Sequence, residues 1–189
     1  MRYADFYECD ICNGNSVGVS LFIQGCPFHC KGCFNPETWD FDGGKEWNKR
    51  TWNKFMNLVD RDYIHRVSFL GGSPLCDENL KDVYNIIAKI KRAYPDKEIW
   101  VYTGMVFEDI IKHYPKEDNF DFSLKAPTKE EARAMLLDHI DVLVDGPFEY
   151  DKRDLTLAFC GSTNQRIIDV KKTLSNANKE IVLWNNETD

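Results

Sequence analysis

The sequence predicts an α/β protein whose mostly parallel sheet forms an open partial (β/α) barrel. Four segments rich in β-branched and aromatic residues alternate along the chain with segments of helical periodicity. This is the pattern of parallel strands joined by right-handed crossovers. Four such units in 189 residues are too few for a closed eightfold barrel, which takes about 250 residues. We therefore expect a single domain over residues 1–189.

The strands are predicted from their apolar content, their length and the turn residues that end them. The first fifteen residues mix aromatic and turn-forming types and end in a turn, so no strand is predicted there. Four strands are expected at residues 17–23, 66–70, 98–102 and 140–144, with two short candidates at 166–170 and 181–184.

Helical spacing of apolar residues predicts four helices between these strands. Pro95 ends the second helix, and Thr128 with Glu131 forms a capping box that begins the fourth. The polar stretch before Thr128 and the fourth helix together form an inserted loop and helix at about 114–136. The predicted helices span residues 51–59, 79–94, 107–113 and 128–138.

Residues suited to binding follow each of the four main strands. Parallel α/β folds place their active sites at the carboxyl edge of the sheet, so these segments are expected to meet on one rim. They are the cysteines after the first strand, Gly71-Gly72-Ser73-Pro74 after the second, Thr103-Gly104 after the third and Asp145-Gly146 after the fourth. Each could also be an ordinary turn, and Asp145 could equally cap the next segment.

Composition narrows the class of protein. The formal net charge is −7 and the pI is about 5.2, which argues against nucleic acid or an anionic membrane as the partner. The chain has no apolar run of the ~18 residues that a membrane span needs, and its start lacks the apolar core of a signal peptide. Seven cysteines without a secretion signal indicate a cytoplasmic protein whose thiols serve metal or redox chemistry.

Three cysteines form the most informative pattern in the chain. Cys26, Cys30 and Cys33 follow the first strand with the spacing Cys-x3-Cys-x2-Cys. Thiolates are the usual ligands of iron–sulfur clusters. Three of them can hold three corners of a [4Fe–4S] cube and leave the fourth iron open to the amine and carboxylate of a small molecule.

A zinc site is the alternative interpretation. Cys9 and Cys12 with Cys30 and Cys33 fall within the spacing range of a four-cysteine zinc site. That arrangement leaves Cys26 unused and encloses a long apolar strand, and it would make the chain a zinc-stabilised binding module. The remaining special side chains have simpler interpretations: Cys76 and Cys160 as small buried hydrophobes and His29 as a surface residue.

Several motifs together resemble those of one protein family. The chain is similar to the anaerobic ribonucleoside-triphosphate reductase-activating proteins, a branch of the radical S-adenosylmethionine enzymes. The cysteine triplet is typical of the superfamily, and the other motifs are typical of the branch. These motifs are Cys-Asp-x-x-Asn-Gly at 9–14, Leu-Phe-x-x-Gly-Cys at 21–26, Gly-Cys-Phe-Asn at 32–35, Thr-Trp at 38–39, Asp-Lys-Glu-Ile-Trp-Val-Tyr-Thr-Gly at 96–104, Val-Asp-Gly at 144–146 and Gly-Ser-x-Asn-Gln-Arg at 161–166.

The resemblance implies a fold of radical S-adenosylmethionine type and an activating enzyme. A [4Fe–4S] cluster on Cys26, Cys30 and Cys33 would bind S-adenosylmethionine and cleave it reductively to a 5′-deoxyadenosyl radical. That radical would generate a glycyl radical on the large subunit of an anaerobic ribonucleotide reductase. A flavodoxin or a ferredoxin would supply the electron. The same chemistry on another glycyl-radical enzyme, such as formate C-acetyltransferase, is the alternative.

The resemblance also assigns the contacts to S-adenosylmethionine, with no catalytic residue beyond the cluster ligands. Ser73 departs from the family, which usually has Asp or Glu there, so a charge-assisted bond to the methionine ammonium is missing. We expect Ser73→Asp not to weaken binding. The implied contacts are Gly32, Cys33 and Phe34 on the adenine side, Gly71, Gly72 and Ser73 at the methionine part, and Thr103 at the ribose or carboxylate.

Overall fold

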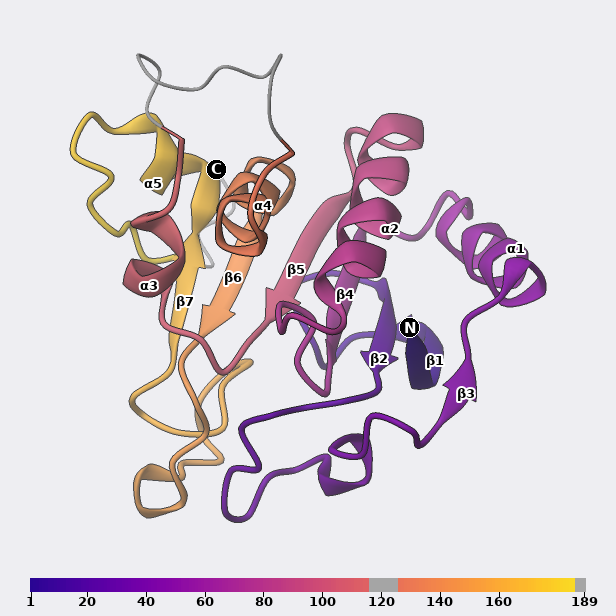
Figure 1. The fold of residues 1–189 in the computed structure, drawn as a ribbon, viewed down its shortest axis with the longest axis horizontal. Coiled ribbons are helices and arrows are strands. Elements are labelled where there is room, and N and C mark those ends of the chain that lie inside the picture. The colour runs from indigo at the N-terminus through magenta and orange to yellow at the C-terminus, as the bar shows by residue number, and fades with distance from the viewer. Residues whose placement is uncertain (116–125, 186–189) are drawn as a thin grey trace.

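A computed structural model describes residues 1–115 and 126–185. The described strands form one sheet in the order β3-β1-β2-β4-β5-β6-β7 (Figure 1). The strands are β1 (Arg2–Asp10), β2 (Gly18–Ile23), β3 (Lys45–Glu46), β4 (Arg66–Gly71), β5 (Glu98–Tyr102), β6 (Val142–Asp145) and β7 (Arg166–Asp169).

The centre of this sheet confirms the predicted fold class. Strands β2, β4, β5 and β6 pair in parallel, each with the next. Outside this parallel centre, β1 and β3 on one side and β7 on the other pair antiparallel with their neighbours. The two edges, β3 and β7, are not paired with each other, so the sheet is open, as expected for a partial barrel.

The N-terminal segment was predicted wrongly. Residues 2–10 form the long strand β1 rather than an irregular stretch, and register shifts after Tyr3 and Tyr7 break its pairing with β2. These irregularities leave no alternation of apolar and polar residues, which is the signal that identifies a strand in sequence. At the other end, 181–184 contributes only the isolated bridge of Leu183 to Ile168, and a helix after β7 was not predicted.

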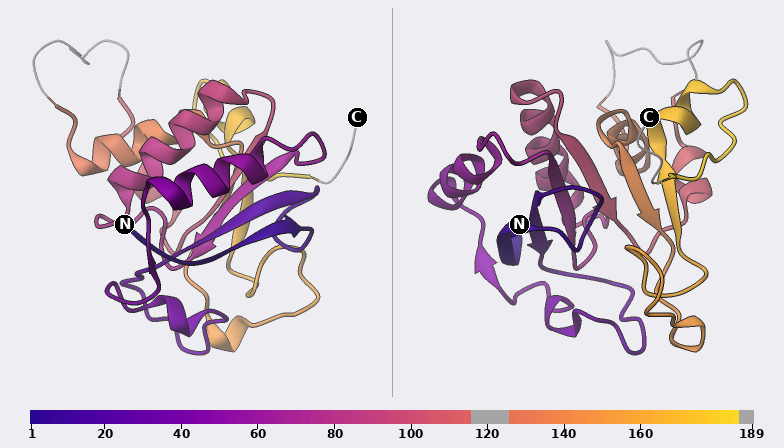
Figure 2. Two further views of the ribbon diagram at one scale, coloured as in Figure 1. Left: turned by 90° about the vertical axis from the view of Figure 1, so that its right-hand side faces the viewer. Right: turned by 180° about the vertical axis from the view of Figure 1, so that it is seen from behind.

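Amphipathic helices cover one face of the sheet (Figure 2). Apolar side chains from the second, fourth, fifth and sixth strands meet those of α1, α2 and α4 in one buried cluster that includes Leu21, Phe69, Val101, Phe55 and Ile87. Burial of these side chains is the main stabilising contribution to the fold. The helices are α1 (Lys49–Val59), α2 (Leu80–Ala93), α3 (Phe107–Ile111), α4 (Lys129–Leu136) and α5 (Val170–Ser175).

The predicted insertion is described only in part. Thr128 and Glu131 form the expected capping box at the start of α4, so this prediction is confirmed. Residues 116–125 of the same insertion lie outside the described residues. Among the helices of the described ranges, none is both long and apolar enough to cross a membrane.

Two long loops extend beyond the carboxyl ends of the parallel strands. The cysteine loop, defined here as residues 26–33, follows β2, and the second loop, residues 146–165, follows β6. Figure 1 shows both at the lower end of the sheet, on the side opposite α2 and α4. The functional positions predicted from sequence therefore lie on the expected rim.

Candidate functional site

The cysteine loop starts from a left-handed backbone turn. Gly25 has φ of +96°, a conformation that glycine adopts without steric cost. Its N–H donates to the carbonyl of Thr38 at 2.8 Å, and the N–H of Cys26 donates to the carbonyl of Trp39 at 3.1 Å. These two bonds hold the start of the cysteine loop against residues 38–39, which follow the loop in sequence. The two ends of the segment that contains the cysteines are therefore held together.

The three thiols of the loop interact with one another. Burial raises the pKa of Cys26, and the neighbouring thiols of Cys30 and Cys33 raise it further. The backbone N–H groups of Phe28 and His29 bond to the Cys26 sulfur and act in the opposite direction. The Sγ of Cys33 accepts the N–H of Asn35 at 3.4 Å. All three are only partly buried.

This donor set fits an iron–sulfur cluster. Cluster sulfurs and their thiolate ligands are stabilised by hydrogen bonds from surrounding N–H groups, which is what the loop provides. A cube binds its ligands at separate iron corners, so the thiols need not converge on one point. In the described ranges, by contrast, no group of three or more His, Cys, Asp or Glu side chains is arranged to hold a single metal ion.

The zinc alternative gains no support from the structure. Cys9 and Cys12 are exposed, and they are not gathered with Cys30 and Cys33 around one centre. A structural zinc site would need four donors at about 2.0–2.3 Å from the ion.

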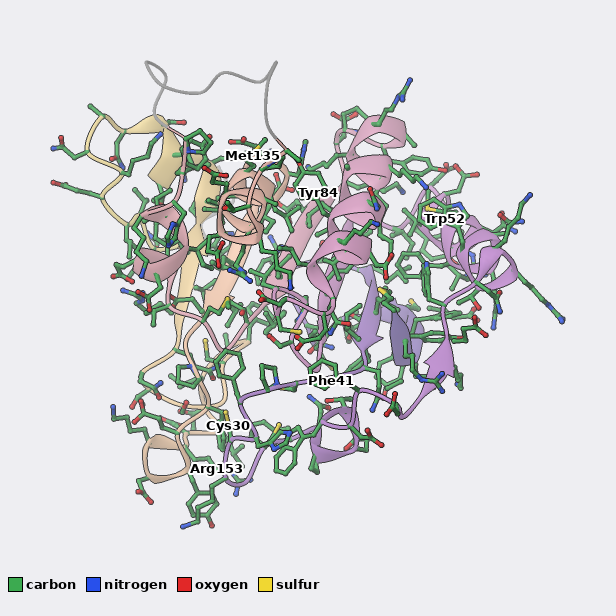
Figure 3. All side chains as sticks on the ribbon, viewed as in Figure 1. Cys30, Phe41, Trp52, Tyr84, Met135 and Arg153 are labelled. Carbon is green, nitrogen blue, oxygen red and sulfur yellow. The ribbon has the colours of Figure 1, made fainter. Side chains whose placement is uncertain are left out.

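The loop after β6 packs against the cysteine loop. Phe34 and Phe148 lie with ring centroids 5.2 Å apart, and Arg153 lies over the ring of Phe34 at 5.5 Å. Lys31 lies over the ring of Tyr150 at 5.2 Å. Figure 3 labels Cys30 and Arg153 in this region. The second loop therefore contacts the cysteine loop at Lys31 and the residue that follows this loop, Phe34.

The Gly-Ser-x-Asn-Gln-Arg motif holds this second loop in shape. The Oε1 of Gln165 accepts the N–H groups of Gly161 and Ser162 at 2.9 and 3.2 Å, and its Nε2 donates to the carbonyl of Gly146 at 3.1 Å. Asn164 donates to the carbonyl of Pro147 at 2.8 Å. Side chains of the motif thus connect both ends of the loop.

Asp145 caps the start of α3 and pairs with Arg166 on β7; no contact of its carboxylate with the cysteine loop is found among the described residues. Its Oδ2 accepts the N–H of Phe107 at 2.8 Å, at the start of α3. Its Oδ1 accepts from Nε of Arg166 at 3.0 Å, and Arg166 also bonds to both oxygens of Glu108. Asp145 is fully buried, so it contributes to the rim as a structural support.

The Gly-Gly-Ser-Pro loop contacts the start of the cysteine loop. The N–H of Ser73 donates to the carbonyl of Gly25, and that of Gly72 to the carbonyl of Ile23, both at 2.8 Å. A Cβ on Gly72 would overlap the Gly25 carbonyl, so the close approach requires glycine. Ser73 is 1% exposed, and its hydroxyl has no hydrogen-bond partner among the described residues.

Asn79 is a site residue that sequence analysis did not identify. It is buried, and its Nδ2 donates to the carbonyls of Gln24, Gly25 and Ser73 at 3.0, 3.3 and 3.1 Å. One amide therefore joins the ends of β2 and β4. The sequence predicted it only as the first residue of the helix at 79–94, and no sequence signal indicated this role.

A cavity of about 690 Å³ opens on the sheet face that the helices leave free. Of the predicted contacts, Cys33 and Phe34 line it, whereas Gly32, Gly71, Gly72, Ser73 and Thr103 do not. Thr103 is buried, and its hydroxyl accepts the N–H of Met105 at 3.1 Å. Lining residues that were not predicted as site residues include Asn13, Tyr102 and Gln165.

A buried ion pair between Arg66 and Asp10 lies on the same face of the sheet as this cavity. Arg66 is fully buried, lies 3.6 Å from Asp10 and donates to the carbonyl of Asn13 at 2.5 Å. Burial acts to raise the pKa of Asp10, but hydrogen bonds from Ser20, the Cys12 N–H and Asn13, with the Arg66 charge, outweigh it and lower that pKa. The motif at 9–14 is thereby fixed to β2 and β4.

The remaining candidates are found as follows. His29 is exposed, as predicted, and its ring stacks on Trp39 with centroids 4.9 Å apart. Cys76 is buried, as predicted. Cys160 is only half-buried and lines the cavity together with Cys12 and Cys33, which the sequence did not indicate.

Comparison with known proteins gives one consistent result. The family model described as a 4Fe-4S single cluster domain matches residues 12–168. The chain is 33% identical over 167 residues to the anaerobic ribonucleoside-triphosphate reductase-activating protein of Salmonella typhimurium, covering 87% of this chain and 96% of that protein. It is 33% identical to the protein of that name from Pasteurella multocida (88% and 96% covered) and 30% identical to that of Enterobacteria phage T4 (88% and 93%).

Proposed function

The chain belongs to the family of anaerobic ribonucleoside-triphosphate reductase-activating proteins, and we propose that Cys26, Cys30 and Cys33 hold its [4Fe–4S] cluster. It is a radical S-adenosylmethionine enzyme that activates an anaerobic ribonucleotide reductase. When bound, the cluster supplies the electron that cleaves S-adenosylmethionine, and the resulting radical chemistry leaves a glycyl radical on the reductase.

One observation carries the assignment of the ligands. Burial, together with the thiols of Cys30 and Cys33, acts to raise the pKa of Cys26, and burial raises the pKa of Cys30. Backbone N–H groups bond to all three sulfurs: those of Phe28 and His29 to Cys26, that of Phe148 in the second loop to Cys30, and that of Asn35 to Cys33. Thiolate is the form that binds iron. The N–H groups stabilise that form although burial opposes it, so the loop is suited to ligation.

For S-adenosylmethionine, we propose the loop 71–74 as the contact to its methionine part. Ser73 supports this, because a buried hydroxyl without a partner is costly and is relieved when a ligand supplies one. Gly32 and Phe34 are proposed beside the adenine, on the exposed side of the cysteine loop. Thr103 is proposed for the ribose or carboxylate, since its hydroxyl keeps a free proton while accepting the Met105 N–H.

The protein itself would position the cluster and the cosubstrate and limit the access of solvent to them. The ring pair of Phe34 and Phe148 places apolar surface beside the cysteine loop. Phe34 is 52% exposed, so a bound cosubstrate would complete the exclusion of water on this side. A dry site protects radical chemistry from side reactions with solvent.

We further propose a flavodoxin or ferredoxin as electron donor, a cytoplasmic location and a single domain over residues 1–189. The single sheet of the described ranges supports the last point.

The function is tested with the anaerobically reconstituted protein, S-adenosylmethionine and dithionite. Mixed with the anaerobic reductase of the same organism, it should produce the electron paramagnetic resonance doublet of a glycyl radical. Formate C-acetyltransferase serves as the parallel substrate. A radical on that enzyme and none on the reductase would favour the other glycyl-radical target.

A further inference from the structure

The cavity beside Cys33 has a largely apolar wall, and its polar lining includes, besides the cysteines, Tyr7, Asn13, Asn35, Tyr102 and Gln165. Phe22, Leu70 and Phe159 contribute apolar surface. Gln165 uses its amide within its own loop, and Nδ2 of Asn13 donates to Asp10 at 2.9 Å. Cavities of this size and composition bind their ligands through a small number of placed polar groups.

Tyr102 supplies such a group. It lies on β5 next to Val144 of β6 in the ladder and lines the cavity. Its hydroxyl is buried and has no hydrogen-bond partner among the described residues. Burial strongly raises the pKa of this phenol, so the hydroxyl keeps its proton and remains a donor at neutral pH.

The position of Tyr102 separates it from the segments proposed for the cosubstrate. Successive side chains of a strand point to opposite faces of the sheet, so Tyr102 faces the cavity while Val101 and Thr103 face the other way. Gly71, Gly72 and Ser73 also lie outside the cavity lining. Cys33 and Phe34, proposed at the cluster and beside the adenine, line the same cavity. We assign the remaining space, in front of Tyr102, to the second reactant, the glycine-bearing chain of the reductase.

We propose that Tyr102 is a positioning residue whose hydroxyl donates a hydrogen bond to a main-chain carbonyl of the glycine-bearing segment of the reductase. The proposal rests on the proposed function. A peptide carbonyl that enters an apolar cavity loses its water and needs a donor there. Glycine allows the segment to approach closely because it has no side chain. The bond would hold the reacting carbon in one orientation beside Cys33.

The test is Tyr102→Phe, which removes the hydroxyl and keeps the ring. Three quantities are measured on the reconstituted protein: denaturation midpoint, affinity for S-adenosylmethionine and affinity for the purified reductase, the last two by anaerobic calorimetry. We expect unchanged or higher stability, unchanged S-adenosylmethionine affinity and about tenfold weaker binding of the reductase, as for one lost hydrogen bond whose partner stays buried. Tyr63→Phe, at an exposed tyrosine, is the matched control and should change none of the three.

Each other result overturns the proposal. A lower denaturation midpoint would assign the hydroxyl a structural role. Weaker binding of S-adenosylmethionine would place the hydroxyl at the cosubstrate. Unchanged binding of the reductase would remove the proposed contact. If the unsubstituted protein takes up no iron and sulfide, the proposed function itself fails, and that failure is seen before any variant is compared.

Discussion

Phe34, the residue after Cys33, packs its ring against Phe148, with centroids 5.2 Å apart and planes inclined by 57°. The contact joins two loops that are more than a hundred residues apart in sequence. Through it, the motif at 161–166, which shapes the second loop by its own hydrogen bonds, supports the cysteine loop. A sequence motif remote from the thiols thus contributes to their placement.

A side chain at position 32 is predicted to destabilise the protein. Gly32 has φ of +73°, and a Cβ there would stand 2.5 Å from Cδ2 of Tyr150. A left-handed conformation costs an L-residue about 1–2 kcal/mol. Gly32→Ala should therefore lower the free energy of unfolding by at least this amount and reduce the iron bound after reconstitution, measured by denaturant titration and iron analysis.

The double variant Gly32→Ala with Tyr150→Ala separates the two causes. Removing the ring relieves the overlap and leaves the backbone strain, so part of the loss should be recovered. If the double variant is as damaged as the sum of both single variants, Tyr150 is not the obstacle.

Ser73→Asp is predicted to destabilise the free protein while leaving S-adenosylmethionine affinity no weaker. Burial of an unpaired carboxylate costs about 2 kcal/mol or more and raises the pKa of the new carboxyl. Because the folded state then keeps the proton to higher pH, stability falls as pH rises above the unfolded value of about 4. The ammonium of the ligand should offset this loss.

Thermal unfolding with and without S-adenosylmethionine measures the effect. The stabilisation by ligand should be larger in Ser73→Asp than in Ser73→Ala, which carries no charge. A large drop in affinity of the aspartate variant by calorimetry would show that the loop does not lie against the methionine part.

Asp10→Asn is predicted to destabilise the protein by about 3 kcal/mol at pH 7, because Arg66 would stay buried without its counter-charge. The pKa of Asp10 is lowered in the folded state. Its contribution is thus fully present above the unfolded value of about 4 and is lost as pH falls through the lower folded value. The difference between the two proteins should shrink on acidification, measured by urea denaturation at pH 7 and below pH 4.

Asp5→Asn provides the comparison. Its carboxylate pairs with Lys45 at 3.2 Å, with both side chains 59% exposed, and such surface pairs contribute about 0–1 kcal/mol. Equal losses in the free energy of unfolding in the two variants would mean that the buried pair stabilises the protein no more than the surface pair.

The parallel core of the fold was accessible from sequence because its signals are local. Short apolar strands, helices of clear periodicity and the Thr128 capping box are each specified within a few residues. The meeting of the rim loops at one edge could be predicted from the general geometry of parallel sheets. The cysteine triplet could be identified from its spacing.

Other features depend on contacts that sequence does not show. Strand β1 is stabilised by pairing with β2 despite its irregular pattern. The roles of Asn79 and Gln165 depend on carbonyl groups brought close by the fold. The cavity position of Tyr102 follows from the register of β5 with β6, which had to be seen in three dimensions.

The most direct test of the proposed cluster site is iron and sulfide content, with the visible absorbance, of single cysteine variants after anaerobic reconstitution. Cys26→Ala, Cys30→Ala and Cys33→Ala should each lose the cluster, whereas Cys9→Ala and Cys12→Ala should keep it. Zinc without sulfide in the unsubstituted protein, together with its loss in Cys9→Ala and Cys12→Ala but not in Cys26→Ala, would contradict the proposed ligands.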